Sequence, residues 1–342
     1  ILLSDHGHSG GHEIVNRRYD VKREVFHAQL QMNVIDAWYQ AEAYRFDFPG
    51  APKNRLRAVS DTDGEVGIFL PLENVDSNDL SIHNNYEQLS HYGLADGKQV
   101  NAVELFAEYS STGRWPLKDV TKRPVDFAVA MVDAETVLVY KTMDRQALIR
   151  SRLNADGLFE FKYEPVRRYV PRRPPEPISS GDPLGYLDSE AFRKEVKDVP
   201  RWLATYHTGT DWLQATCKTD YPGCVNTLSL YFRWDRAVTP DAPVPAQPDI
   251  LMFASRGWVF EPKINLANRA EHTIGSRHGM AFREATNNSL FICGPGIRKG
   301  VIVDTPHRMV DIMPTVLQMM GRESDSIGMD GRPIREIWEG FQ

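Results

Sequence analysis

Residues 1–7, which read Ile-Leu-Leu-Ser-Asp-His-Gly, decide the fold that the sequence predicts. The first three residues form an apolar run without polar alternation, which is typical of a strand buried on both faces of a parallel sheet. Asp5 and His6 follow this run directly. In open α/β sheets functional groups gather at the carboxyl ends of strands, so the same stretch predicts a functional site. Because a central strand needs neighbours, we expect further chain upstream of Ile1.

Helix and strand patterns continue on the C-terminal side of this stretch. Apolar residues recur at steps of three and four between residues 21 and 39, which predicts a helix with Asp20 as its N-cap. Alternating elements of this kind favour an α/β layer architecture. Short apolar runs predict further strands, and apolar periodicity predicts a last helix; the strands lie at 65–70, 126–132, 136–140, 250–254 and 290–293, and the helix at 311–320.

The middle of the chain has a different composition. Residues 165–183 carry six Pro and four Arg, which predicts an extended and solvated surface loop. Aromatic residues are dense between positions 202 and 234, which indicates a packed sub-lobe. We interpret the four arginines as a basic loop and not as a nucleic-acid patch, because few aromatic residues are interleaved with them.

Composition limits the class of protein. The chain has 342 residues, 42% hydrophobic and 25% charged, as in a soluble globular protein. Its formal net charge of -6 argues against binding to a nucleic-acid polymer, which requires a concentrated basic face. The sequence has no run of eighteen apolar residues, so we expect no membrane span.

Two groups of potential metal ligands lie far apart in the sequence. Asp5 and His6 offer a carboxylate and an imidazole, with Gly7 leaving room for close approach and His8 adding a further imidazole. The second group, His272 and His278, precedes the predicted strand at 290–293 and the Gly-Pro-Gly that follows it. Glycines flank His278, which predicts a tight loop that directs its side chain into a site.

These motifs, in this order, resemble the alkaline phosphatase superfamily, and within it the type I phosphodiesterase and nucleotide pyrophosphatase branch. The residues that carry the resemblance are 1–14, 61–72 and about 248–321. The resemblance implies an α/β fold with a mostly parallel central sheet sandwiched by helices. It also implies that 1–74 and 248–342 form the C-terminal part of a catalytic domain. Residues 75–247 would then be a large insert or cap sub-lobe that contains the loop 165–183.

The resemblance also implies a site with two divalent metal ions, of which zinc is favoured. Asp5 and His6 would bind one ion and His278 the other, with His272 and His8 as weaker alternatives. Arg277, an insertion relative to the common Gly-Ser-His-Gly pattern, would meet an anionic substrate. The Ser or Thr nucleophile of the family would lie before Ile1, so an upstream N-terminal segment or another chain would complete the site.

The function that the resemblance implies is metal-dependent hydrolysis of small phosphate esters. Phosphodiesters or nucleotide pyrophosphates would react through a covalent phosphoryl-enzyme intermediate. The alternatives are a sulfatase or phosphomonoesterase of the same superfamily, or a catalytically inactive binding protein that keeps the fold.

Three cysteines and one sequon add smaller predictions. Cys217 and Cys224 enclose a turn-rich stretch and form either a local disulfide or two free thiols. Cys293 lies in a predicted buried strand and is interpreted as a core residue. Asn287 begins an Asn-x-Ser sequon. The family and the close cysteine pair favour a periplasmic or extracellular protein.

Overall fold

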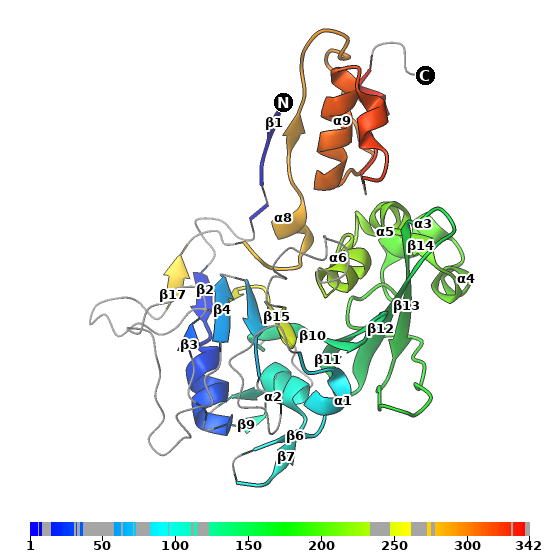
Figure 1. Ribbon diagram of the computed structural model, residues 1–342. Helices are drawn as coiled ribbons and strands as arrows, with labels where there is room; N and C mark the ends of the chain where they lie inside the picture. Colours follow the sequence, from blue (N-terminus) through cyan, green and yellow to red (C-terminus); the bar gives the residue numbers. More distant parts are fainter. Residues whose placement is uncertain are drawn as a thin grey trace.

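A nine-stranded sheet forms the body of the molecule (Figure 1). The computed structural model describes residues 1–5, 7–8, 15–30, 32, 35–36, 58–62, 64–70, 72, 83–94, 96–110, 113–114, 123–232, 247–260, 272–274, 278–329 and 331–338. Across the sheet the strands lie in the order β14 (His207–Thr208), β13 (Phe159–Val166), β12 (Arg145–Leu153), β11 (Thr136–Thr142), β10 (Val125–Asp133), β15 (Ile250–Ala254), β5 (Glu65–Ile68), β4 (Ala58–Thr62) and β3 (Ile35–Asp36).

The strands of this sheet are antiparallel to their neighbours, apart from the parallel pair β3 and β4. β10 and β11 pair from Asp133 and Thr136 onward, so two residues connect them. Such a connection can only join antiparallel strands, because a parallel return needs a crossover of about a dozen residues. The predicted mostly parallel sheet is therefore wrong for the described residues. The α/β combination itself is confirmed, and so are the strands predicted at 126–132, 136–140 and 250–254.

Helices cover both faces of the sheet. The side chains of β10 alternate between two hydrophobic clusters, because successive residues of a strand point to opposite faces. Ala128 and Ala130 face a cluster with α1 (Tyr86–Leu89), α2 (Ala102–Glu108) and the π-helix η1 (Lys22–Leu30). Phe127 and Val129 face a cluster with α3 (Glu190–Val196), α5 (Gly209–Thr216), α6 (Cys224–Tyr231) and α8 (Arg283–Thr286). The predicted packing of helices on both faces is confirmed.

Smaller elements surround this body. The helix predicted at 21–39 is too long. The helix η1 ends at Leu30, and the strand β3 begins at Ile35. The helix α4 spans Val199–Ala204. A three-stranded sheet contains, in order, β16 (Trp258–Val259), β2 (Val15–Arg18) and β17 (His272–Ile274). Two strand pairs complete the list, β6 (Tyr92–Gly93) with β7 (Gln99–Val100) and β8 (Tyr109–Ser110) with β9 (Gly113–Arg114).

An arm projects from the body in Figure 1 and contains residues 1–5, 287–329 and 331–338. In it β1 (Leu2–Leu3) pairs antiparallel with β18 (Leu290–Phe291), beside the helix α9 (Ile312–Met319) that the sequence predicted at 311–320. The arm also contains the 3-10 helices η4 (Met309–Asp311), η5 (Glu323–Ser326) and η6 (Arg335–Ile337).

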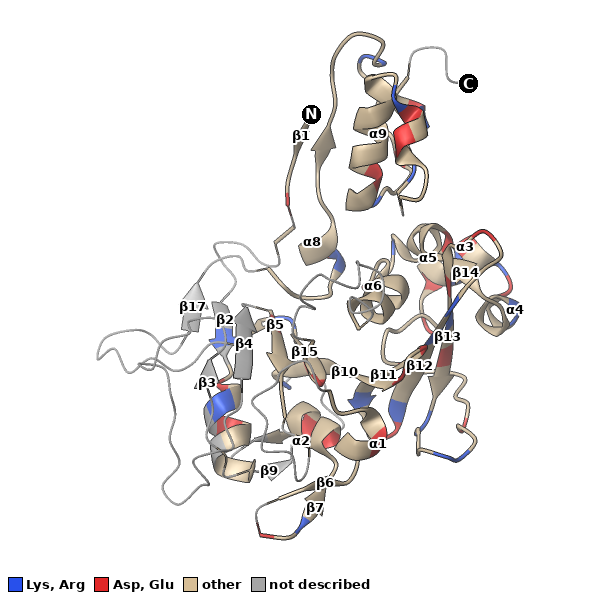
Figure 2. Cartoon of the chain, in the orientation of Figure 1, with Lys and Arg blue, Asp and Glu red and all other residues tan. Residues whose placement is uncertain are grey.

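The arm corrects the prediction made from residues 1–3. β1 is not a buried central strand, since Leu2 is 69% exposed and its partner Phe291 is 65% exposed. β1, β18 and α9 contain no charged residue (Figure 2). Among the described residues, every exposed large hydrophobic side chain apart from Leu153 belongs to the arm. An apolar run indicates a tendency to be buried, but the burial itself requires neighbours that a two-stranded ribbon does not provide.

The large sheet joins parts of the chain that the sequence assigned to different regions. β3, β4, β5 and β15 come from residues 1–74 and 248–342, whereas β10 to β14 come from residues 75–247. The two predicted regions therefore share one sheet, and the boundaries between them stay predictions. Within the described part of the chain, no helix has both the length and the apolar character needed to cross a membrane.

Candidate metal site

The structure brings together the two sequence motifs that carry potential metal ligands. The imidazole rings of His8 and His278 lie edge to face, with 5.9 Å between their centres. Two imidazoles bound to one zinc ion through bonds of about 2.0–2.1 Å have ring centres roughly 5–6 Å apart. The separation therefore suits two ligands of one ion, after a rotation of the rings.

Glycines allow the backbones of these segments to approach each other. A Cβ atom on Gly7 would lie 2.4 Å from the carbonyl oxygen of Glu284, and one on Gly64 would lie 2.6 Å from that of His278. Gly279 has a φ of +81°, which glycine adopts without strain. At Gly7 the backbone of α8 comes so close that no side chain would fit.

The segment with Asp5 and His8 is attached to α8 and the residues just after it. The amide of Gly7 donates to the carbonyl of Ala285 over 3.0 Å. The side-chain amide of Asn288 donates to the Asp5 carbonyl over 3.2 Å. Because His278 lies shortly before α8 in the sequence, both candidate segments are fixed to one helical turn.

A half-buried glutamate lies next to the His278 loop. Glu65 on β5 pairs with Phe253 on β15, so the two side chains share a face of the sheet. Phe253 belongs to the hydrophobic cluster that includes Met280. Burial raises the pKa of Glu65 to about 7, so this carboxyl group is partly protonated at neutral pH. Burial, and then the charge of Glu65, raises the pKa of Tyr231 to about 12.

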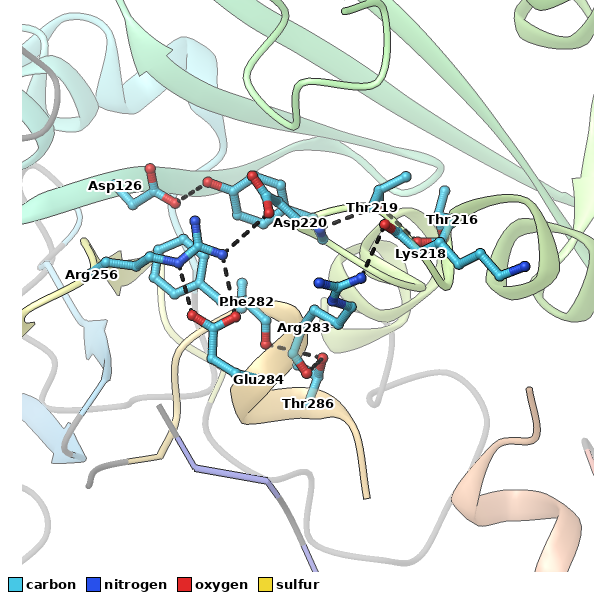
Figure 3. Close-up of polar contacts among 12 residues, drawn as sticks. Asp126, Thr216, Lys218, Thr219, Asp220, Arg256, Phe282, Arg283, Glu284 and Thr286 are labelled. Atoms are coloured by element: carbon cyan, nitrogen blue, oxygen red, sulfur yellow. Dashed lines mark hydrogen bonds and ion pairs between the residues drawn. The ribbon is translucent and has the colours of Figure 1, made fainter. Parts of the chain in front are cut away.

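An arginine clamp holds α8 against the body (Figure 3). The Arg256 guanidinium donates to both carboxylate oxygens of Glu284, over 2.8 and 3.2 Å, and to Asp220 over 3.3 Å. Its guanidinium carbon lies 4.3 Å from the ring centre of Phe282. Arg256 thereby joins the turn after β15, the loop between α5 and α6, and α8.

A buried ion pair with a tyrosine lies beside this clamp. Lys141 on β11 contacts Asp126 on β10 over 2.8 Å, and the Tyr221 hydroxyl donates to the same carboxylate over 2.6 Å. Burial, and then the adjacent Asp126, raises the pKa of Tyr221 well above its usual value. The phenol therefore stays protonated and serves as a hydrogen-bond donor that holds the α5–α6 loop on the sheet.

The other predicted site residues are distributed as follows. His6 and Arg277 lie outside the described residues. The backbone of His272 belongs to β17. Within the described residues, no three or more His, Cys, Asp or Glu side chains gather as a metal-binding group. The described part of the chain therefore brings two imidazoles near each other, and a metal site would need further ligands.

The cysteines resolve the alternative that the sequence left open. Cys217, Cys224 and Cys293 are free thiols, so no disulfide joins the first two. Cys224 is buried in the cluster beneath α6, and burial followed by the charge of Asp126 raises its pKa to about 12. Cys293 is exposed in the arm, which corrects its interpretation as a core residue. Asn287 of the sequon is exposed as well.

Comparisons of the chain with protein-family models, curated proteins and solved structures found no match.

Sequence reasoning missed Glu65, Arg256 and the Lys141–Asp126–Tyr221 group. The signal for Glu65 and Asp126 was present, because each is an acidic residue in an otherwise apolar strand. Such residues are seldom buried without a partner or a shifted pKa. Arg256 gave no signal, since its partners are distant in the sequence and lie in a loop and in the helix α8.

Proposed function

We propose that this chain forms part of a metal-dependent hydrolase of phosphate esters. Phosphodiesters or nucleotide pyrophosphates would be the substrates, and the nucleophile that forms the covalent phosphoryl-enzyme would lie upstream of Ile1. The observation that supports the proposal is the approach of His8 to His278, because it unites the two motifs on which the resemblance to the alkaline phosphatase superfamily depends.

The chain's own residues would hold and orient the metal ions, of which the resemblance implies two. His8 or His6, together with Asp5 and His278, would provide the ligands. Bound zinc supplies positive charge that stabilises a phosphoryl group and its leaving oxygen. Imidazoles bind metal only when neutral, so protons compete with zinc for these ligands. Arg277 would add a cation for the substrate.

The first experiment measures zinc binding by the metal-free chain with calorimetry and elemental analysis. We expect His278→Ala to weaken zinc binding by at least about tenfold. Comparing His6→Ala with His8→Ala identifies the imidazole that accompanies His278. His91→Ala, an exposed histidine bonded to Ser90, is the matched control and should leave binding unchanged. A wild-type protein that includes the upstream segment and folds, but binds no zinc, contradicts the proposal.

The second experiment distinguishes the reaction classes. Nitrophenyl phosphate, bis-nitrophenyl phosphate and nitrophenyl sulfate are assayed with a protein that includes the upstream segment. Preferential turnover of the diester supports the proposal, whereas turnover of the monoester or the sulfate favours the two related activities. Zinc binding without turnover of any substrate favours a binding protein that keeps the fold.

A further inference from the structure

Both segments with candidate ligands depend on the position of α8. The Asp5–His8 segment is bonded to Ala285 and Asn288, and the His278 segment leads directly into the helix. A helix of only four residues has little stability of its own, so tertiary contacts must fix it. Whatever holds α8 therefore also sets the geometry between the two candidate segments.

We propose that Arg256 is a positioning residue that fixes α8 and so holds the Asp5–His8 segment against His278. Its planar fork engages both oxygens of Glu284, which restricts the orientation of α8 as well as its distance. Asp220 and the ring of Phe282 restrain the guanidinium from two further directions. The metal-binding consequence rests on the proposed function, whereas the positioning itself does not.

Further hydrogen bonds near Arg256 also connect α8 to the body (Figure 3). The amide of Arg283 donates to the Asp220 carbonyl over 2.8 Å, and its guanidinium donates to the Lys218 carbonyl over 3.2 Å. The α5–α6 loop that accepts these bonds is itself held on β10 by the Tyr221 hydroxyl. A continuous set of contacts therefore runs from the sheet to α8.

A role in positioning differs from a role in overall stability. The Arg256 side chain is 49% exposed, and ion pairs at that exposure contribute little to the stability of a whole domain. Mutation of groups that orient the metal ligands, without binding the metal themselves, typically weakens metal affinity by about 10–100-fold. Loss of the clamp should therefore change the local geometry much more than the unfolding transition.

The test compares Arg256→Ala with Arg152→Ala. Arg152 is a matched control because it also donates twice to one glutamate, over 3.0 and 2.9 Å, and lies 4.2 Å from a ring centre, that of Tyr206. Its carboxylate partner, Glu160, lies on β13 and not on α8. Arg256→Lys keeps the charge but not the fork, and should give an intermediate result.

Two measurements are made on each variant. Hydrogen exchange of the Gly7 amide in the metal-free protein reports positioning directly, and we expect about tenfold faster exchange in Arg256→Ala. Zinc titration reports the site, and we expect about tenfold weaker binding. Arg152→Ala should change neither quantity, and all variants should unfold at similar urea concentrations.

The outcomes separate this inference from the proposed function. Unchanged Gly7 exchange in Arg256→Ala overturns the positioning role, whatever the zinc result. Faster exchange with unchanged zinc affinity supports the positioning role and overturns its metal-binding consequence, because the candidate ligands would then not depend on α8. If the wild-type protein binds no zinc, the proposed function fails, and faster Gly7 exchange would still support Arg256 as the residue that positions the segment.

Discussion

Glu65 illustrates how strongly a single residue responds to its surroundings. Its side chain lies on the same face of the sheet as Phe253, which belongs to one of the two hydrophobic clusters. Removal of the charged form from water costs free energy, and the carboxyl group retains its proton as a result. Its pKa rises from 4.5 to about 7, so its protonation changes near neutral pH.

We predict that Glu65 makes stability depend on pH in a defined direction. The folded protein binds the proton more tightly, so this contribution to stability is complete below about pH 4.5 and is lost as pH rises through 7. The neutral Glu65→Gln variant lacks this loss. Relative to the wild type, its free energy of unfolding should gain up to about 3 kcal/mol between pH 4.5 and 8.

Urea denaturation at several pH values measures this difference. Glu190→Gln, an exposed residue of α3, controls for the change from carboxylate to amide. A difference between Glu65→Gln and the wild type that stays constant with pH would show that the carboxyl group is not the source.

Residue-scale predictions from the sequence succeeded where a local rule applied. A glycine between two potential ligands predicted close approach, and Gly7 does lie against the Glu284 carbonyl. Cys293 failed because its interpretation depended on a buried strand, and burial depends on distant partners. The clamp at Arg256 was not predictable, because its residues come from three segments that are far apart in the sequence. These are the turn after β15, the α5–α6 loop and α8.

Among the elements, β10 and β11 are joined to the α5–α6 loop by a buried polar group. Lys141 and Asp126 have side-chain exposures of only 14% and 10%, and Tyr221 completes the hydrogen bonding of the carboxylate. A buried pair of this kind makes the removal of one partner costly, because the other charge stays buried without compensation.

We predict that Lys141→Met destabilises the protein by about 3–5 kcal/mol in urea denaturation. Lys98→Met is the matched control, since Lys98 pairs with Asp96 over 2.7 Å while both side chains are more than half exposed, at 77% and 52%. That variant should give no resolvable change. Equal effects of the two substitutions would mean that burial does not determine the energy of the pair.

The sequence located some of the longer elements and missed others, among them the strands β12 and β13 and the helices α5 and α6. Alternation and apolar runs located β10, β11, β15 and α9, because these signals depend only on nearby residues. The direction of pairing depends on the connections, and the short link between β10 and β11 is antiparallel by necessity. The expected parallel sheet came from the apolar run at residues 1–3 and from the resemblance, and the length of the β10–β11 connection argues against it.

At the scale of the whole molecule, the body and the arm differ in how they bury apolar surface. The body places its apolar residues in two clusters, one on each face of the sheet. The arm leaves Leu2, Phe291 and Ile302 exposed, the last at 87%. The short ribbon that carries Leu2 and Phe291 is stable only when it packs against other structure.

We therefore predict that the arm opens separately from the body. Amides of the ribbon, such as Ser4 bonded to Ser289, should exchange about a hundredfold faster than those of β10 to β12, which corresponds to an opening free energy lower by about 3 kcal/mol. Hydrogen exchange measured by mass spectrometry at two protein concentrations tests this. Exchange in the arm as slow as in β10 would contradict it and would mean that the apolar surface is covered in solution. If hydrogen exchange in the arm slows only at the higher protein concentration, a second copy of the chain covers its apolar side chains.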